Sequence, residues 1–161
     1  MKKILLFFVI FLALTNVSHA GAPKVGDKAP DFSVTSVTGE KLTLSSLKGK
    51  VVLMGMFHIC VPCMNQALEF EKIRKQQGKD NLVIIGVNTN GDSKVDVMDY
   101  LAKFPTPIQF PYYLDPEMSV FKAYVQRDMP TVLIIDKEGV IRFRSSSIAA
   151  DQLIQRFDKL F

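Results

Sequence analysis

The stretch MFHICVPCMNQ, residues 56–66, decides how the rest of the chain is interpreted. It contains Cys60 and Cys63, which are the only two cysteines among the 161 residues. A pair with two residues between its members can be a structural disulfide, part of a metal site, or a dithiol that exchanges electrons. A structural disulfide is disfavoured, because it would close a very small loop and the entropy gained from so short a loop is small.

Metal binding by the pair would need further ligands nearby. Zinc normally takes four protein ligands, and after residue 20 the chain adds only one histidine and no further cysteine. Copper fits better, because soft ligands select Cu(I) and five soft or borderline ligands lie within nine residues. They are Met56, His58, Cys60, Cys63 and Met64. Copper binding is therefore kept as an alternative to redox chemistry.

The position of the pair between a predicted strand and a predicted helix favours redox chemistry. Residues 51–56 are a continuous apolar run typical of a buried strand, and residues 62–77 follow a helical pattern with Pro62 early in the first turn. A Cys60 thiolate would face the unpaired N–H groups and the positive end of that helix, which would lower the pKa of the thiol. Cys63, one turn later, would be shielded and placed to resolve a mixed disulfide.

The remaining pattern predicts an α/β domain with a mixed sheet. Residues 32–44 indicate a β-hairpin around Thr38-Gly39, and residues 131–144 indicate another around residues 137–139. The helix after Cys60 is expected to stop at Gly78. The other predicted elements are strands at 81–88 and 112–114, a helix capped by Ser93 with Val97, Tyr100, Leu101 and Phe104 on its apolar face, a helix at 116–124, and an amphipathic helix at 149–161.

The first twenty residues have the layout of a secretory signal peptide. Lys2 and Lys3 give a positive start, residues 4–14 are an unbroken apolar run, and residues 18–20 offer small residues where a signal peptidase cuts. We expect cleavage after Ala20, which leaves residues 21–161 as one soluble domain in the periplasm or another extracytoplasmic space. Cysteine pairs persist as disulfides in such compartments. The alternative is an uncleaved N-terminal membrane anchor.

The charge balance gives no support to a nucleic-acid partner. The net charge of +4 falls to +2 without the signal peptide, because two of the twenty basic residues and no acidic residue lie there. No long basic run remains, and the aromatic residues are mostly phenylalanines at buried-looking spacings. We expect a monomer that does not bind nucleic acid.

Seven motifs follow one another in an order that carries a family resemblance. They are KVGDKAPDF, TGEKLTLSSLKGKVVLMGMF, CVPC, VIIGVN, FPYYLDPEMSVFKAY, MPT and LIIDKEGVI. Over about residues 24–160, the chain resembles the extracytoplasmic thioredoxin-like proteins of the TlpA/ResA type, within the redoxin (AhpC/TSA) superfamily. The resemblance implies a thioredoxin-like fold, with an N-terminal β-hairpin and a strand–helix insertion between Gly78 and Tyr112.

The resemblance also implies roles for individual residues. Cys60 matches the nucleophile and Cys63 the resolving cysteine, so the pair would be a redox-active Cys60–Cys63 disulfide that needs no cofactor and no metal. Pro130 matches a cis-proline that shapes the substrate groove. Met129, Val61 and Pro62 would border the same groove.

Three positions depart from the family pattern. Ile59 stands where relatives often have tryptophan, Gln66 where they often carry an acid near the sulfurs, and Met54 where thioredoxins have a buried acid. Gln66 cannot exchange protons, and we expect a glutamate there to raise the Cys60 pKa. His58 is left as a candidate for tuning Cys60, the alternative being a solvated loop histidine.

The function implied by the resemblance is thiol–disulfide exchange with protein substrates outside the cytoplasm. The usual direction in this family is reduction of partner disulfides, including those of apocytochrome c, with electrons from a membrane thiol transporter of the DsbD/CcdA type. Thiol peroxidase activity is a further alternative, because peroxiredoxins share the same lead-in. They carry a hydroxyl residue and a proline where this chain has Phe57 and Leu53, so peroxide binding is not expected.

Overall fold

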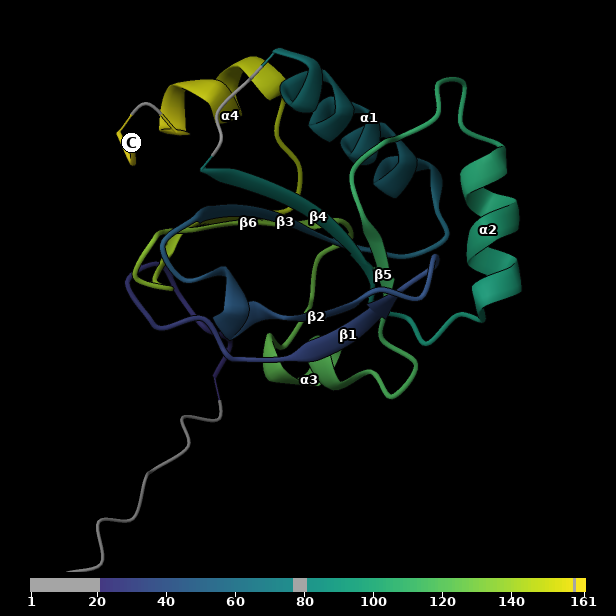
Figure 1. Cartoon of the computed structure of the whole chain (residues 1–161), viewed down its shortest axis with the longest axis horizontal. Helices are drawn as coiled ribbons and strands as arrows, with labels where there is room; N and C mark the ends of the chain where they lie inside the picture. The colour runs from purple at the N-terminus through teal and green to yellow at the C-terminus, as the bar shows by residue number, and fades with distance from the viewer. Residues whose placement is uncertain (1–20, 77–80, 158) are drawn as a thin grey trace, which may run out of the picture.

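A seven-stranded mixed sheet forms the centre of the domain, in the order β2-β1-β5-β4-β3-β6-β7 (Figure 1). The structure is a computed structural model that describes residues 21–76, 81–157 and 159–161. The predicted signal peptide and the predicted helix stop at Gly78 lie outside the described residues. The strands are β1 (Ser33–Ser36), β2 (Lys41–Thr43), β3 (Val51–Phe57), β4 (Leu82–Asn88), β5 (Tyr112–Leu114), β6 (Thr131–Ile135) and β7 (Ile141–Ser145).

The strand pairing confirms the thioredoxin-like α/β architecture. The two hairpins, β1–β2 and β6–β7, are antiparallel, and they stand at the two ends of the sheet. Between them, β3, β4 and β5 run parallel to one another, while β6 is antiparallel to β3. The segment expected as an insertion between Gly78 and Tyr112 supplies β4, which is a central strand of the sheet.

Helices cover both faces of the sheet. Helices α1 (Val61–Gln76) and α4 (Ala150–Phe157) lie over one face and α3 (Ser119–Ala123) lies over the other (Figure 1). Helix α2 (Lys94–Ala102) contributes to the core on the α1 side, and a 3₁₀ turn (Leu44–Leu47) follows β2. Among the described helices, none is long and apolar enough to cross a membrane.

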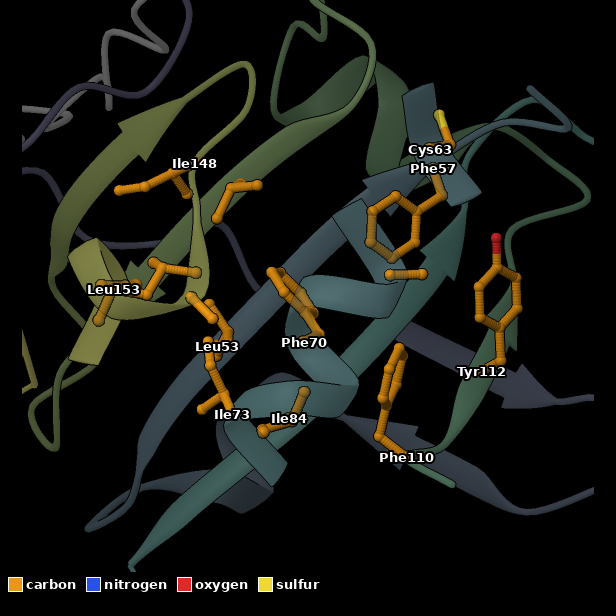
Figure 2. Packing of buried hydrophobic residues seen from close by; sticks show 14 of the residues in the cluster. Leu53, Phe57, Cys63, Phe70, Ile73, Ile84, Phe110, Tyr112, Ile148 and Leu153 are labelled. Carbon is orange, nitrogen blue, oxygen red and sulfur yellow. The ribbon is translucent and has the colours of Figure 1, made fainter. Parts of the chain in front are cut away.

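Strand β3 is buried on both faces, which explains its continuous apolar sequence. Because side chains alternate along a strand, Leu53 and Phe57 enter the core under α1, while Met54 and Met56 enter the core on the α3 side. Figure 2 shows the α1-side core, in which the Phe57 ring lies near Phe70 and Tyr112 and Cys63 lies beside it. Residues 58–60 therefore follow directly from a fully buried strand.

Two helices are shorter than predicted. Helix α3 begins at Ser119 rather than Pro116, because Met118 takes a left-handed conformation with φ of 53°. The Asp115 carboxylate accepts hydrogen bonds from the Ser119, Val120 and Phe121 amides and so fixes the later start. Helix α4 ends at Phe157, although Leu153 and Phe157 are buried as the apolar periodicity predicts.

Candidate functional site

The two cysteines lie where the central strand β3 passes into helix α1. Strand β3 ends at Phe57, two residues follow, and Cys60 immediately precedes the helix while Cys63 lies in its first turn. Both are free thiols in this structure. Cys60 is half-buried, whereas the Cys63 side chain is only 1% exposed. The pair therefore has one accessible sulfur and one inaccessible sulfur.

The Cys60 sulfur occupies the position of a helix N-cap side chain. It accepts a hydrogen bond from the Cys63 amide over 3.3 Å, and the Cys60 carbonyl accepts one from the Met64 amide over 3.0 Å. The side-chain oxygen of an ordinary N-cap residue accepts a hydrogen bond from the amide of the second or third helical residue. Here the second residue is Pro62, which has no amide hydrogen, so the third residue, Cys63, is the donor. A negative charge on this sulfur is stabilised by the hydrogen bond and by the positive end of the helix.

The Cys63 sulfur lies in a nonpolar environment that disfavours its thiolate. Burial raises the pKa of Cys63 to about 12, and the neighbouring Cys60 adds to the increase. The His58 amide donates a hydrogen bond to the Cys63 sulfur over 3.3 Å, which acts in the opposite direction. At neutral pH, Cys63 is therefore a protonated thiol.

Helix α2 reaches the same site through Tyr100. The Tyr100 hydroxyl donates a 2.7 Å hydrogen bond to the Cys60 carbonyl, forty residues earlier in the chain. Burial raises the pKa of Tyr100, and the charges of Cys63 and Cys60 raise it further, so the phenol stays protonated and able to donate. In the sequence, Tyr100 occupies one of several positions on the apolar face of a predicted helix. Nothing in the neighbouring residues indicates that its hydroxyl binds the Cys60 carbonyl.

Removing the Tyr100 hydroxyl tests how firmly α2 holds the motif. We expect Tyr100→Phe to lower the free energy of unfolding by about 1 kcal/mol, because the Cys60 carbonyl loses one of its two hydrogen bonds. Denaturant titration measures this change. Tyr113→Phe is the matched control, since the Tyr113 hydroxyl has no hydrogen bond to any described residue and Tyr113 lies in the α3-side core. Equal losses in the two variants would show that the Tyr100 hydrogen bond contributes nothing specific.

The residues predicted to border the groove lie at two places, the start of β6 and the start of α1. The Met129–Pro130 peptide bond is cis, and Thr131 pairs with Met56 across β6 and β3, which brings Pro130 beside the end of β3. Pro130 is buried while Met129 is 48% exposed. On the helix side Val61 is 67% exposed and Pro62 is also exposed. The exposed residues at these two places, Met129, Val61 and Pro62, are uncharged.

His58 is not a solvated loop histidine, because its side chain is buried. The ring is buried, lies 6.3 Å from the Phe121 ring of α3 and therefore sits on the α3 side of the sheet, away from Cys63. Burial lowers the pKa of His58, while Asp92 and Gln126 oppose the shift. Only the His58 backbone amide touches a sulfur.

The buried imidazole should make stability depend on pH near neutrality. In the unfolded state His58 takes up a proton at the ordinary histidine pKa of about 6.5. In the folded state burial lowers the pKa of His58, so the imidazole takes up a proton only at a lower pH. The unfolded state thus holds more protons below about pH 6.5, and the free energy of unfolding should fall as pH decreases from about 7.5 to 5, by at most about 1.4 kcal/mol per pH unit. Chemical denaturation at several pH values measures this slope. His58→Gln should flatten it, and an unchanged slope would contradict a buried neutral imidazole.

Gln66 points its amide at the backbone of the segment between β7 and α4. Its Nε2 donates to the Ile148 carbonyl over 2.9 Å, and its Oε1 accepts from the Ile148 amide over 2.8 Å. One turn later, Glu69 accepts a 2.8 Å hydrogen bond from the Ala150 amide at the start of α4. Because both polar atoms of the Gln66 amide bind Ile148, the structure gives no support to the expectation that a carboxylate at this position would face the sulfurs. A contact over 82 residues has no local signal in the sequence.

The candidate copper ligands do not converge. Met56 is fully buried in the α3-side core, Cys63 belongs to the α1-side core, and the His58 ring lies against α3. Among the described residues, there is also no cluster of three or more His, Cys, Asp or Glu side chains that could hold a metal ion.

The two positions at which a peroxidase would bind peroxide are held by Leu53 and Phe57, both fully buried and apolar.

Comparisons with known proteins identify a family and curated relatives of the chain. Residues 25–144 match the model of the AhpC/TSA family. The chain is 30% identical over 143 residues to the thiol-disulfide oxidoreductase ResA of Bacillus subtilis, which covers 86% of this chain and 78% of ResA. It is 31% identical over 118 residues to the thioredoxin-like protein YneN of the same organism, covering 73% of this chain and 68% of YneN.

A solved structure shows the same likeness in three dimensions. The crystal structure of a Chlorobium tepidum protein assigned as the thiol:disulfide interchange protein DsbE superimposes with a TM-score of 0.75. Its sequence is 26% identical, and the match covers 86% of this chain and 99% of that protein.

Proposed function

The chain belongs to the AhpC/TSA family and is a thiol-disulfide oxidoreductase of the ResA/DsbE type, and from this premise we propose that it reduces disulfide bonds of proteins outside the cytoplasm. The observation that supports exchange is the asymmetry of the pair: Cys60 is accessible and caps a helix, whereas Cys63 is buried with a pKa of about 12. The reducing direction rests on the family resemblance, and the compartment rests on that resemblance and on the first twenty residues. One accessible attacker and one shielded resolver suit an exchange reaction that passes through a mixed disulfide.

The first chemical step takes place at Cys60. Its thiolate attacks one sulfur of a substrate disulfide, a Cys60–substrate S–S bond forms, and the substrate S–S bond breaks. The departing substrate sulfur leaves as a thiolate and takes up a proton. The exposed Val61, Pro62 and Met129, together with the cis-proline Pro130, border the place where the substrate chain would lie.

The second step takes place at Cys63. Once Cys60 is bonded to substrate, it no longer carries the charge or the hydrogen bond that helps to raise the Cys63 pKa, so Cys63 becomes easier to deprotonate. Its sulfur then attacks the Cys60 sulfur, and its proton passes to the second substrate thiolate as that leaves. The substrate gains two electrons, and the chain ends as a Cys60–Cys63 disulfide.

The proposed setting rests on the family resemblance and on the signal-like first twenty residues, and the proposed partners rest on the family resemblance alone. We place the domain outside the cytoplasm, after cleavage of residues 1–20, or tethered if those residues are kept as an anchor. The substrates would be proteins with oxidised cysteine pairs, such as apocytochrome c, and a membrane thiol transporter of the DsbD/CcdA type would restore the dithiol. Both partners would therefore react at the Cys60 sulfur, one with the reduced pair and the other with the oxidised pair.

Electron transfer to a defined peptide tests the proposal. Reduced, metal-free protein should reduce a synthetic peptide with an oxidised C-x-x-C-H sequence, the haem-attachment motif of c-type cytochromes, with one peptide disulfide reduced per protein. Cys60→Ser should transfer no electrons, which controls for carry-over of reductant. Absence of transfer by the unmodified protein, or transfer only after copper is added, would overturn the proposal.

A further inference from the structure

The amide side chain of Gln66 makes two hydrogen bonds to the backbone of a single residue. Nε2 donates to the Ile148 carbonyl over 2.9 Å, and Oε1 accepts from the Ile148 amide over 2.8 Å. Gln66 is 3% exposed and Ile148 is 9% exposed, so water does not compete for these bonds. Helix α1 is thereby fastened to the segment that joins β7 to α4.

The fastened segment forms one wall of a groove that begins at the cysteine motif. An open groove of about 530 Å³ lies between the first turns of α1 and residues 147–152. Pro62, which stands between the two cysteines, belongs to its lining, as do Gln66 and Ile148. Ile148 also belongs to the same buried cluster as Cys63, and Figure 2 shows both residues around the α1-side core. A shift of this segment would therefore change the surface next to the motif.

We propose that Gln66 is a positioning residue whose neutral amide holds the wall of this groove in place, so that the groove receives the substrate chain on the Pro62 side at any pH. This inference rests on the proposed function. A substrate chain bonded to the Cys60 sulfur must cross the residues beside it, and the groove, which Pro62 helps to line, offers such a chain a path along α1 and residues 147–152.

The chemistry of the two hydrogen bonds explains why an amide suits this position. One atom of the side chain must donate to a carbonyl while the other accepts from an amide. Glutamine does both without carrying charge. A glutamate of the same shape could do both only when protonated, because an ionised carboxylate would place a second acceptor against the Ile148 carbonyl. Burial and that carbonyl would raise the pKa of such a carboxyl above its ordinary value of about 4.3.

Two substitutions separate the amide from the space that it fills. Gln66→Leu keeps most of the volume but loses both hydrogen bonds, and we expect the KM for insulin reduction, with dithiothreitol as the electron source, to rise about tenfold at every pH. Gln66→Glu should resemble the wild type near pH ~5.5 and show the same increase in KM near pH ~8, where the carboxyl is ionised. Gln76→Glu, an exposed position on the same helix, controls for the added charge.

Hydrogen exchange and alkylation distinguish a positioning role for Gln66 from a purely structural role and from a direct electrostatic effect on Cys60. The Ile148 amide should lose protection about tenfold in Gln66→Leu, and in Gln66→Glu only at the higher pH, whereas the alkylation of Cys60 by iodoacetamide should be the same in all variants. Lost protection with an unchanged KM would show that Gln66 is only structural and would overturn the proposal. Slower alkylation in Gln66→Glu with an unchanged KM would overturn it too, because the charge would then act directly on the sulfur. If the wild type reduced no disulfide, the proposed function would fail, and the exchange data would still report on the Gln66–Ile148 contact.

Discussion

Replacing Cys63 by serine is expected to trap the chain in a mixed disulfide with its substrate through Cys60. The accessible Cys60 sulfur can still attack, but the variant has no second thiol to release the product. Mixing the reduced variant with an oxidised protein should give a stable adduct on a non-reducing gel, and mass spectrometry of its peptides should place the bond at Cys60.

The complementary change should abolish the reaction. In Cys60→Ser the remaining thiol is 1% exposed and protonated at neutral pH, so we expect exchange to slow by at least about a thousandfold, with no adduct. Both variants should unfold at a denaturant concentration close to that of the wild type, which would rule out misfolding as the cause. An adduct that forms chiefly through Cys63 would reverse the assigned roles.

Alkylation of the reduced, native protein should modify one cysteine only. Because burial raises the pKa of Cys63 to about 12, this side chain is a protonated thiol at pH 7, and its sulfur is also shielded from the reagent. Cys60 is accessible, and its anion is stabilised by the Cys63 amide and the end of α1. We therefore expect iodoacetamide to react with Cys60 at least about a thousandfold faster than with Cys63.

Peptide mass analysis after timed quenching measures the two alkylation rates. The same protein in denaturant should take up two labels at similar rates, which controls for any intrinsic difference between the peptides. Comparable rates in the native protein would contradict the burial of Cys63 and with it the division of roles between the cysteines.

The sequence predicts those features of the site that depend on residues close together in the chain. Cys60 and Cys63 stand at a strand-to-helix junction, and both elements have strong patterns of their own: the apolar run that became β3 and the helix with Pro62 in its first turn. Pro130 was placed by a motif whose neighbours form the β6–β7 hairpin. The extent of α3 was less predictable, since Asp115 and the left-handed Met118 set its start.

Contacts between distant segments could not be predicted from the same patterns. Tyr100 reaches the Cys60 carbonyl across forty residues, and Gln66 binds Ile148 across 82. The pattern of apolar residues along a helix does not indicate which distant residue either side chain will bind. The direction of His58 was within reach of the sequence, because alternation along β3 puts Met56 on the α3 side and Phe57 on the α1 side, and one further step returns His58 to the α3 side.

The central claim is that Cys60 and Cys63 form a reversible redox couple that acts as a reductant, and its most direct test is the reduction potential of that couple. The purified, metal-free protein would be equilibrated in glutathione and dithiothreitol buffers, quenched with acid, and its thiols counted by mass. We expect a single two-electron transition between dithiol and intramolecular disulfide, with a potential more negative than about −200 mV. A pair that does not form a reversible disulfide without metal, or one that titrates near the strongly oxidising value of about −120 mV, would contradict this account.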